Sequence, residues 1–367
     1  MTAPAQNPRL AAARRAHILS ALSRAGAVRV TELSAELDVA AVTLRRDLQL
    51  LEAEGLLVRV HGGAVATQRE PGAVAPRVSA DGVLRPAGAI GVLVPSLNYY
   101  WPEVVRGMEA RAGERGASVL LRGTSYELQD ERPVLARMVE EGASGFILAP
   151  NTDTAHSQDV LEWLADAGLP YVLVERDATP PGGSPAESVT TDHAHGAVLA
   201  ARHLASLGHR KVGLVISRNS PTSRKIVAGW NAACRELGLT PGEHVERVLP
   251  DRSTPEFSAT VHAILDTVRR SGITALLVHS DPEAMAFVDL ALSRGLTVPG
   301  DLSIVAYDDE VAQLFTPALT AVAPPRAAVG RAAVDLLLDR LADPSRPVHR
   351  VVLNPALHAR ASSGPQR

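Results

Sequence analysis

Hydrophobic and polar positions follow three different rhythms along the chain. Residues 1–64 show helical periods and then a short alternating run, and residues 65–87 show no period. Residues 88–367 alternate between short apolar runs and amphipathic helices. Because apolar positions repeat every three to four residues in a helix and every second residue in a strand, these rhythms predict three regions. We expect a small helical domain with a β-ribbon, a proline-bearing linker and a larger α/β domain.

The first region predicts three helices followed by a strand. The expected elements are a helix at 8–25, an extended piece at 28–30, a helix capped by Thr31 that ends at residue 37, a helix from about residue 41 to Gly55, and a strand at 56–60. At about 100° per residue, Leu44, Leu48 and Leu51 share one face of the third helix. This face is expected to pack on the preceding helices.

The third region predicts two parallel sheets in series. Apolar runs at 90–94, 118–121, 145–148, 171–174, 212–215, 275–278 and 303–306 alternate with helices at 102–115, 131–141, 158–167, 193–207, 224–237, 256–271 and 283–294. Short buried strands separated by helices are typical of doubly wound parallel sheets. We expect two lobes with a cleft between them, and ligands bind beyond the carboxyl ends of the strands in such sheets.

Composition narrows the class of protein. A chain of 367 residues with a formal net charge of −3 is long enough for two or three folding units and is no generic polyanion binder. The single cysteine, Cys234, excludes an intrachain disulfide. The first residues lack an apolar segment of signal-peptide length and no run of eighteen apolar residues occurs, so we expect a soluble, cytoplasmic protein without a membrane partner.

The third helix carries the first candidate chemistry. Residues 1–64 hold eight arginines against six acids, and the basic side chains include Arg45 and Arg46 opposite the leucine face. Arginine can bond guanine in a major groove or hold a phosphate, and the Thr43 hydroxyl can bond a phosphate. Arg59, His61 and the backbone amide of Gly62 are placed to approach the DNA backbone beside the groove. An ordinary solvated helix with surface arginines is the alternative for Arg45 and Arg46 alone.

Two neighbouring positions have structural interpretations. Asp47 lies at the edge of the leucine face, so we interpret it as a structural ion-pair partner. Leu50 points outward in this register, under the wing or toward a dimer contact.

The ends of the predicted strands carry the second set of candidates. They are Asn98, Tyr99, Tyr100 and Trp101 after the first strand, Glu175, Arg176 and Asp177 after the fourth, and then Ser223, Arg224, Ser280, Asp281, Tyr307, Asp308 and Asp309. Aromatic faces stack on sugars, while carboxylates and guanidinium groups bond hydroxyls. Such a site suits a neutral polyol better than a phosphorylated one. The alternatives are a cap for Asp308 or Asp309, an interlobe ion pair for Arg176, and rim packing for Tyr99.

The N-terminal region resembles the DeoR-type winged helix-turn-helix. The resemblance rests on Arg14 with Ile18, on the run TLRRDL at 43–48, and on GLLVRVHGGA at 55–64. It implies a helix that reads DNA and a wing. Ala40 stands where this family usually has serine, which removes a helix cap worth about 1 kcal/mol.

The region from Gly88 to about Ser362 resembles the LacI-type effector domain, which is itself similar to periplasmic sugar-binding proteins. The matching pieces are DHAHG at 192–196, HLASLGHR at 203–210, VPGDLSIVAYDD at 298–309 and PALT at 317–320. The resemblance implies that Tyr100 and Trp101 stack on the effector and that Arg176, Arg224, Asp281 and Asp308 are polar contacts. Ser280 replaces the usual asparagine, and the linker shows none of the hinge helix usual in this family.

Other chemistries find little support. His193 and His195 lie about 200° apart on a helix, and His195 and His203 are separated by about 12 Å along its axis, so we expect no metal site. The phosphate-loop, nucleophile-elbow and dinucleotide patterns do not occur. We therefore expect no cofactor and no enzyme activity.

Together these patterns predict a transcriptional regulator, in the form of a repressor. Residues 1–64 would bind an operator, residues 65–87 would link, and residues 88–367 would bind a small sugar-like effector. The protein would act as a homodimer on double-stranded DNA with an inverted repeat. The alternative is a sugar-binding protein whose N-terminal domain docks a protein partner.

Overall fold

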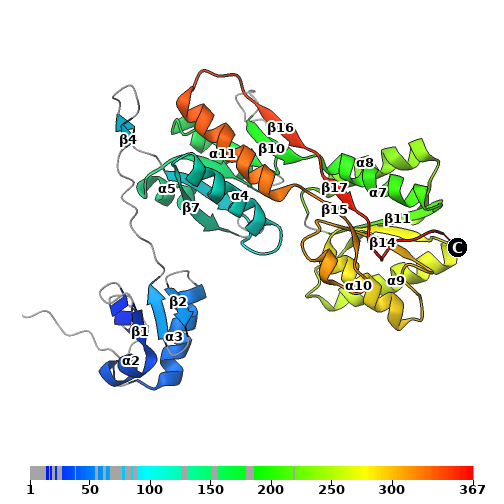
Figure 1. Cartoon of the computed structure of the whole chain (residues 1–367), viewed down its shortest axis with the longest axis horizontal. Coiled ribbons are helices and arrows are strands. Elements are labelled where there is room, and N and C mark those ends of the chain that lie inside the picture. Colours follow the sequence, from blue (N-terminus) through cyan, green and yellow to red (C-terminus); the bar gives the residue numbers. More distant parts are fainter. Residues whose placement is uncertain are drawn as a thin grey trace, which may run out of the picture. The chain divides into compact units, whose positions relative to one another are not determined.

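The computed structural model describes residues 14–15, 17–18, 21–22, 27–37, 39–53, 57–60, 63–66, 77–78, 84–85, 89–124, 130–150, 156–178, 186–217 and 220–366. The chain divides into two units, Met1–Pro86 and Ala87–Arg367, and each is described by itself (Figure 1).

The first unit has the second and third predicted helices and a three-stranded antiparallel sheet, while both ends of the helix predicted at 8–25 lie outside the described residues. Its elements are β1 (Ala27–Arg29), α2 (Val30–Leu37), α3 (Ala41–Ala53), β2 (Leu57–Val60) and β3 (Gly63–Ala66), with strand order β1-β3-β2. The described residues between 14 and 22 are helical. Ile18, Leu33 and the leucine face of α3 are buried together. Helix α2 begins at Val30, so Thr31 lies inside its first turn and is not the cap that we expected.

Two short strands occur in the segment that we predicted as an irregular linker. Strands β4 (Arg77–Val78) and β5 (Leu84–Arg85) form an antiparallel pair, and β3 extends two residues past the predicted domain boundary at residue 64. Pairs this short leave too little alternation in the sequence to be recognised.

The second unit consists of two lobes, each built on a six-stranded sheet (Figure 1). The sheet of the first lobe is parallel throughout, in the order β16-β10-β9-β8-β6-β7. The elements of this lobe are β6 (Ala89–Val94), α4 (Trp101–Glu114), β7 (Ser118–Gly123), α5 (Arg132–Glu140), β8 (Ala143–Leu148), α6 (His156–Asp166), β9 (Tyr171–Val174), β10 (Glu187–Thr191), α11 (Arg326–Ala342) and β16 (Arg350–Leu353).

The second lobe has the order β12-β11-β13-β14-β15-β17. Its elements are α7 (His193–Ser206), β11 (Lys211–Ser217), α8 (Ser223–Leu237), β12 (Thr240–Leu249), α9 (Pro255–Ser271), β13 (Ala275–Val278), α10 (Asp281–Ser293), β14 (Ser303–Tyr307), η1 (Ala312–Leu314), β15 (Thr320–Ala323) and β17 (Ala356–His358). Strand β17 runs antiparallel to β15, so the second sheet departs at this edge from the parallel arrangement that we predicted.

The lobes are interleaved in the sequence. The chain enters the second lobe after β10, returns to the first after β15 and crosses again between β16 and β17. At the first crossing the Asp192 carboxylate accepts a hydrogen bond from the backbone N–H of His195, at 2.8 Å, and caps α7. The predicted two-lobed α/β architecture is confirmed, although α11 and β16 return to the first lobe. Among the helices that the structure describes, none combines the length and the apolar character of a membrane span.

Candidate functional site

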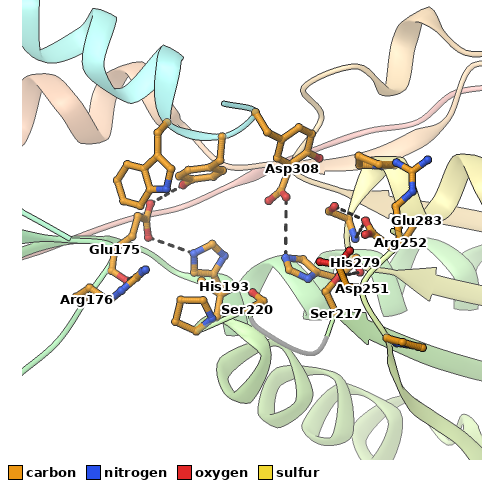
Figure 2. Close-up of a pocket in the computed structure, with 18 residues that line it drawn as sticks. Glu175, Arg176, His193, Ser217, Ser220, Asp251, Arg252, His279, Glu283 and Asp308 are labelled. Atoms are coloured by element: carbon orange, nitrogen blue, oxygen red, sulfur yellow. Dashed lines mark hydrogen bonds and ion pairs between the residues drawn. The ribbon is translucent and has the colours of Figure 1, made fainter. Parts of the chain in front are cut away.

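A cavity of about 430 Å³ lies between the lobes, at the carboxyl ends of both sheets (Figure 2). The first lobe contributes Tyr99, Tyr100, Trp101, Glu175 and Arg176 to its lining. The second lobe contributes His193, Ser217, Arg252, His279, Ser280 and Asp308, among others. This is where parallel sheets bind ligands, because the loops that follow their strands converge there.

The first lobe supplies an aromatic wall. Trp101 begins α4 and is 2% exposed, and the ring of Tyr100 meets it edge to face with the centroids 5.6 Å apart. The guanidinium carbon of Arg176 lies 6.0 Å from the centroid of the Trp101 ring. Arg176 also donates to the backbone carbonyl oxygens of Pro150 and Glu175, at 3.0 and 2.8 Å. The Trp101 ring is therefore held in place between Tyr100 and Arg176 on this side of the cavity.

Glu175 is the hydrogen-bonding centre of that wall. Its carboxylate accepts from the Tyr100 hydroxyl at 2.7 Å, from the Thr191 hydroxyl at 2.7 Å and from the Thr191 N–H at 3.0 Å, and it pairs with Nε2 of His193 at 3.1 Å. Burial alone would raise its pKa, but His193 and the other donors lower the pKa of Glu175 to about 2. With two partners on each oxygen, Glu175 positions the wall.

His193 is fixed at both ring nitrogens. Nε2 faces Glu175, and Nδ1 lies 3.1 Å from the hydroxyl oxygen of Tyr307. Tyr307 is fully buried and also donates to the backbone carbonyl of His193, at 3.2 Å. The pair therefore ties the end of β14 to the start of α7.

His279 and Asp308 form the opposite, second-lobe side of the cavity. They follow the adjacent strands β13 and β14, are 6% exposed each, and approach with Nε2 3.9 Å from Oδ2 (Figure 2). Burial lowers the pKa of His279 to about 4 and raises the pKa of Asp308 to about 6. At neutral pH the pair is therefore a neutral ring beside a carboxylate.

Asp281 lies behind the cavity wall. Its carboxylate accepts from the backbone N–H groups of residues 309, 310, 311 and 312 at 2.7 to 3.2 Å, and it is absent from the described lining. Burial and the charge of Asp308 raise its pKa to about 7 despite these donors. Its own N–H donates to the Tyr99 hydroxyl at 3.2 Å. The structure gives Asp281 a structural role in the loop after β14, where the resemblance implied an effector contact.

Three other predicted contacts have different surroundings. Asn98 and Arg224 are exposed and do not line the cavity within the described residues. Arg224 is the second residue of α8. The residues that line the cavity here come just before this helix and include Ser220 and Thr222. Ser280 does line the cavity, but its hydroxyl donates to Glu283 at 2.6 Å in a capping box.

The predictions missed His193, His279 and Arg252 as lining residues. His279 directly follows the apolar run at 275–278, so its strand-end position was a usable signal. His193 and Arg252 follow β10 and β12, whose sequences carry no clear strand pattern.

The first unit supports the predicted orientation of α3. Leu44, Leu48 and Leu51 are buried, while Arg46 is exposed and Thr43 is half-buried. Leu50 is exposed, as predicted. The side chains of Arg45 and Arg59, together with residues His61 and Gly62, lie outside the described residues.

Asp47 has the structural role that we predicted. It is buried and forms an ion pair with the buried Arg14 of the preceding helical segment. A buried carboxylate needs such a partner, because desolvation disfavours an unpaired charge.

Comparison with known proteins decides the family. A model of the DeoR-like helix-turn-helix domain matches residues 14–70, and a model of the periplasmic binding protein-like domain matches residues 201–363. An uncharacterized HTH-type transcriptional regulator from Streptomyces limosus is 32% identical over 289 residues, which are 76% of this chain and 80% of that protein. A LacI family transcriptional regulator from Enterococcus faecium, solved with bound ribose, is 25% identical with a TM-score of 0.63, over 76% of this chain and 100% of that one.

This chain belongs to the LacI family of transcriptional regulators. The HTH-type transcriptional regulator MalR from Streptomyces coelicolor is also similar, with 30% identity over 285 residues, 76% of this chain and 81% of that protein. This LacI-family protein is a DNA-binding transcriptional regulator that joins a DeoR-like helix-turn-helix domain to a LacI-type effector domain. These relatives argue against the alternative of a sugar-binding protein with a partner-docking domain.

Proposed function

We propose that this regulator is a repressor whose operator affinity is controlled by a neutral sugar bound between the two lobes. The observation that carries the proposal is the cavity, in which a wall containing Tyr100 and Trp101 faces the acceptors of His279 and Asp308. An apolar face opposite hydrogen-bonding groups matches the two kinds of surface on a sugar ring. The ribose bound by the Enterococcus faecium regulator supports the same ligand class.

The charges around the cavity favour a neutral ligand over a phosphorylated one. The lining contains the acids Glu175, Asp251, Glu283 and Asp308 against the arginines Arg176 and Arg252. An anionic group would meet this excess of negative charge across a short distance. Binding of a sugar requires no cofactor, metal or catalytic step, so we propose a regulator without enzyme activity. Because its proposed partner is operator DNA, we place the protein in the cytoplasm.

Within this proposal residues 1–64 read the operator, residues 65–87 connect, and residues 88–367 bind the effector. Helix α3 enters the major groove with Thr43, Arg45 and Arg46, and the wing residues Arg59, His61 and Gly62 lie along the DNA backbone. A homodimer places its two helix-turn-helix domains on an inverted repeat, with half-sites about one helical turn or a multiple of it apart. Arg46 on the exposed side of α3 supports this orientation.

The first test is a thermal-shift screen of the full chain. The panel contains D-ribose, D-glucose, D-galactose, maltose and cellobiose, each with its phosphate where one exists. A sugar at a hundred times its Kd stabilises the folded state by about 2.7 kcal/mol and raises Tm. A shift with a neutral sugar and none with its phosphate is expected. Silence across all the neutral sugars would contradict the sugar assignment.

Two reciprocal variants separate the two binding functions. Trp101→Ala removes the buried stacking face, so we expect at least a tenfold loss of sugar affinity by isothermal titration calorimetry and retained operator binding without sugar. Arg46→Ala should abolish specific operator binding in a gel-shift assay and leave the sugar Kd within about twofold. An Arg46→Ala protein that still binds the operator normally would refute the role of α3.

A further inference from the structure

The lining of the cavity has two ends that lie apart. Figure 2 shows Glu175 and Arg176 at one end, which we call the inner end, and Asp251, Arg252 and Glu283 at the other, which we call the outer end. The volume of about 430 Å³ falls in the range of about 300–1,000 Å³ that is typical of sites for drug-sized ligands, which are larger than a single sugar ring. One ring at the inner end would therefore leave the outer end unused.

Two consecutive tyrosines serve the two ends. Tyr99 has a φ of 59°, in the left-handed region, whereas Tyr100 has a φ of −63°. Such a backbone conformation at a residue other than glycine is uncommon and clusters at ligand sites. The Tyr100 hydroxyl donates to Glu175 at 2.7 Å, and the Tyr99 hydroxyl accepts from the backbone N–H of Asp281 at 3.2 Å. Since Asp281 begins α10 two residues before Glu283, Tyr99 brings an aromatic ring to the outer end.

The outer end carries hydrogen-bonding groups that the folded chain leaves open. Arg252 is exposed, and its guanidinium has no hydrogen bond or ion pair among the residues that the structure describes. The Asp251 carboxylate bonds Ser253 through Oδ1, and the Glu283 carboxylate bonds Ser280 through Oε2. Within the described residues the second oxygen of each carboxylate has no such bond. Guanidinium donors, carboxylate acceptors and an aromatic ring therefore meet at this end, and these groups bind sugar hydroxyls and sugar faces.

The inner end has a corresponding set of groups. The rings of Tyr100 and Trp101 form its aromatic wall, and the carboxylate of Asp308 lies beside it as an acceptor. Glu175 already has two partners on each oxygen, so Asp308 is the acceptor that a ligand can use there. Each end is thus equipped for one sugar ring.

We propose that the cavity holds two linked sugar rings, so that the effector is a neutral disaccharide. The inference rests on the proposed sugar-responsive function and names the class of sugar. The inner ring packs on Tyr100 and donates a hydroxyl to Asp308, and the outer ring packs on Tyr99 and accepts hydrogen bonds from Arg252. A monosaccharide fills one end, leaves the contacts of the other end unmade and binds more weakly.

Isothermal titration calorimetry on the full chain compares disaccharides with their component rings. The disaccharides are maltose, cellobiose, trehalose, lactose and melibiose, which contain only D-glucose and D-galactose, and D-ribose is titrated beside them. We expect one disaccharide to bind at least about tenfold more tightly than any of the three monosaccharides. The Kd of a monosaccharide too weak for direct titration is obtained by displacement of that disaccharide.

Arg252→Ala tests the outer ring. The variant removes a contact that only the disaccharide makes, so its preference for the disaccharide over the component ring should fall about three- to tenfold. Arg269→Ala removes an exposed arginine of α9 outside the described lining and is the matched control, with an unchanged preference.

The other outcomes overturn the inference in distinguishable ways. A monosaccharide that binds as tightly as every disaccharide would refute the second ring while the proposed function stands. An unchanged preference in Arg252→Ala would contradict the assignment of the outer end. No binding of any of these neutral sugars to the wild type would refute the proposed function itself.

Discussion

Three buried carboxylates around the cavity differ in how completely they are hydrogen-bonded. Glu175 has two partners on each oxygen, and Asp281 holds four backbone N–H groups. Asp308 is also buried, and its carboxylate approaches the neutral ring of His279, with Oδ2 3.9 Å from Nε2, which is too far for a hydrogen bond. The first two carboxylates therefore maintain the architecture, and the third is available to a ligand.

The availability of Asp308 predicts a pH dependence of sugar binding. A sugar hydroxyl that donates to the carboxylate favours its charged form, so affinity is highest above the pKa of about 6 and falls as pH drops below it. We expect binding about tenfold weaker at pH 5 than at pH 7.5. The charged and titratable groups that face Asp308 are His279, His193, Tyr99, Tyr307, Glu175, Asp281, Glu283 and Arg326.

Calorimetry of the wild type and of Asp308→Asn separates these groups. The variant should bind more weakly at pH 7.5 and lose most of the change in affinity between the two pH values. A wild-type Kd that is the same at pH 5 and pH 7.5 would exclude a donated bond to an ionised Asp308.

The Arg14–Asp47 pair gives a second prediction for a single residue. Asp47→Ala leaves a buried guanidinium without this carboxylate, so we expect the first unit to lose about 3–5 kcal/mol of stability. Hydrogen exchange of the α3 amides in the full chain measures the loss. Glu36→Ala, which breaks an exposed contact with His17, is the control and should change exchange little. Equal protection in both variants would contradict a structural role for Asp47.

At the scale of elements, the sequence predicted most helices to within one or two residues but missed several strands. Helices with a clear apolar face, such as α8 and α9, were predicted almost as observed. Strand β12 begins with Thr-Pro-Gly-Glu-His, which shows no alternation, and β17 has three residues. Their pairing with distant strands decides their conformation, and a periodicity of the local sequence cannot reveal it.

The close packing of α4 on α11 gives a prediction at this scale. A Cβ atom on Gly107 would lie 2.2 Å from the carbonyl oxygen of Ala327, whereas one on Gly113 of the same helix meets nothing within 4 Å. Gly107→Ala should therefore force the helices apart and lower stability by about 1–3 kcal/mol. Gly113→Ala should be neutral or stabilising by up to about 1 kcal/mol. Calorimetric Tm values in the same direction for both variants would contradict this packing.

At the scale of the whole molecule, the expectation that residues at the carboxyl ends of the strands line the ligand site located the cavity. It did not identify all of the residues that line it. It correctly brought Tyr100, Trp101, Arg176 and Asp308 together. It failed for Asp281 and Arg224, because a position near a strand end does not determine whether a side chain faces the cavity, the loop behind it or solvent. The interleaving of the lobes could not be predicted from the sequence either, since an apolar run does not show which sheet its strand joins.

The central claim is that sugar bound between the lobes controls binding of the operator by the first unit. The most direct measurement is the Kd for the DNA upstream of the protein's own coding region, by fluorescence anisotropy, with and without a saturating panel sugar. We predict a change of about 5- to 150-fold, which corresponds to a coupling of 1–3 kcal/mol, in the wild type. At the same sugar concentration Trp101→Ala should show a smaller change, because its weaker site needs at least about ten times more sugar to fill. An operator Kd that is unchanged by a sugar shown to fill the cavity would contradict the account.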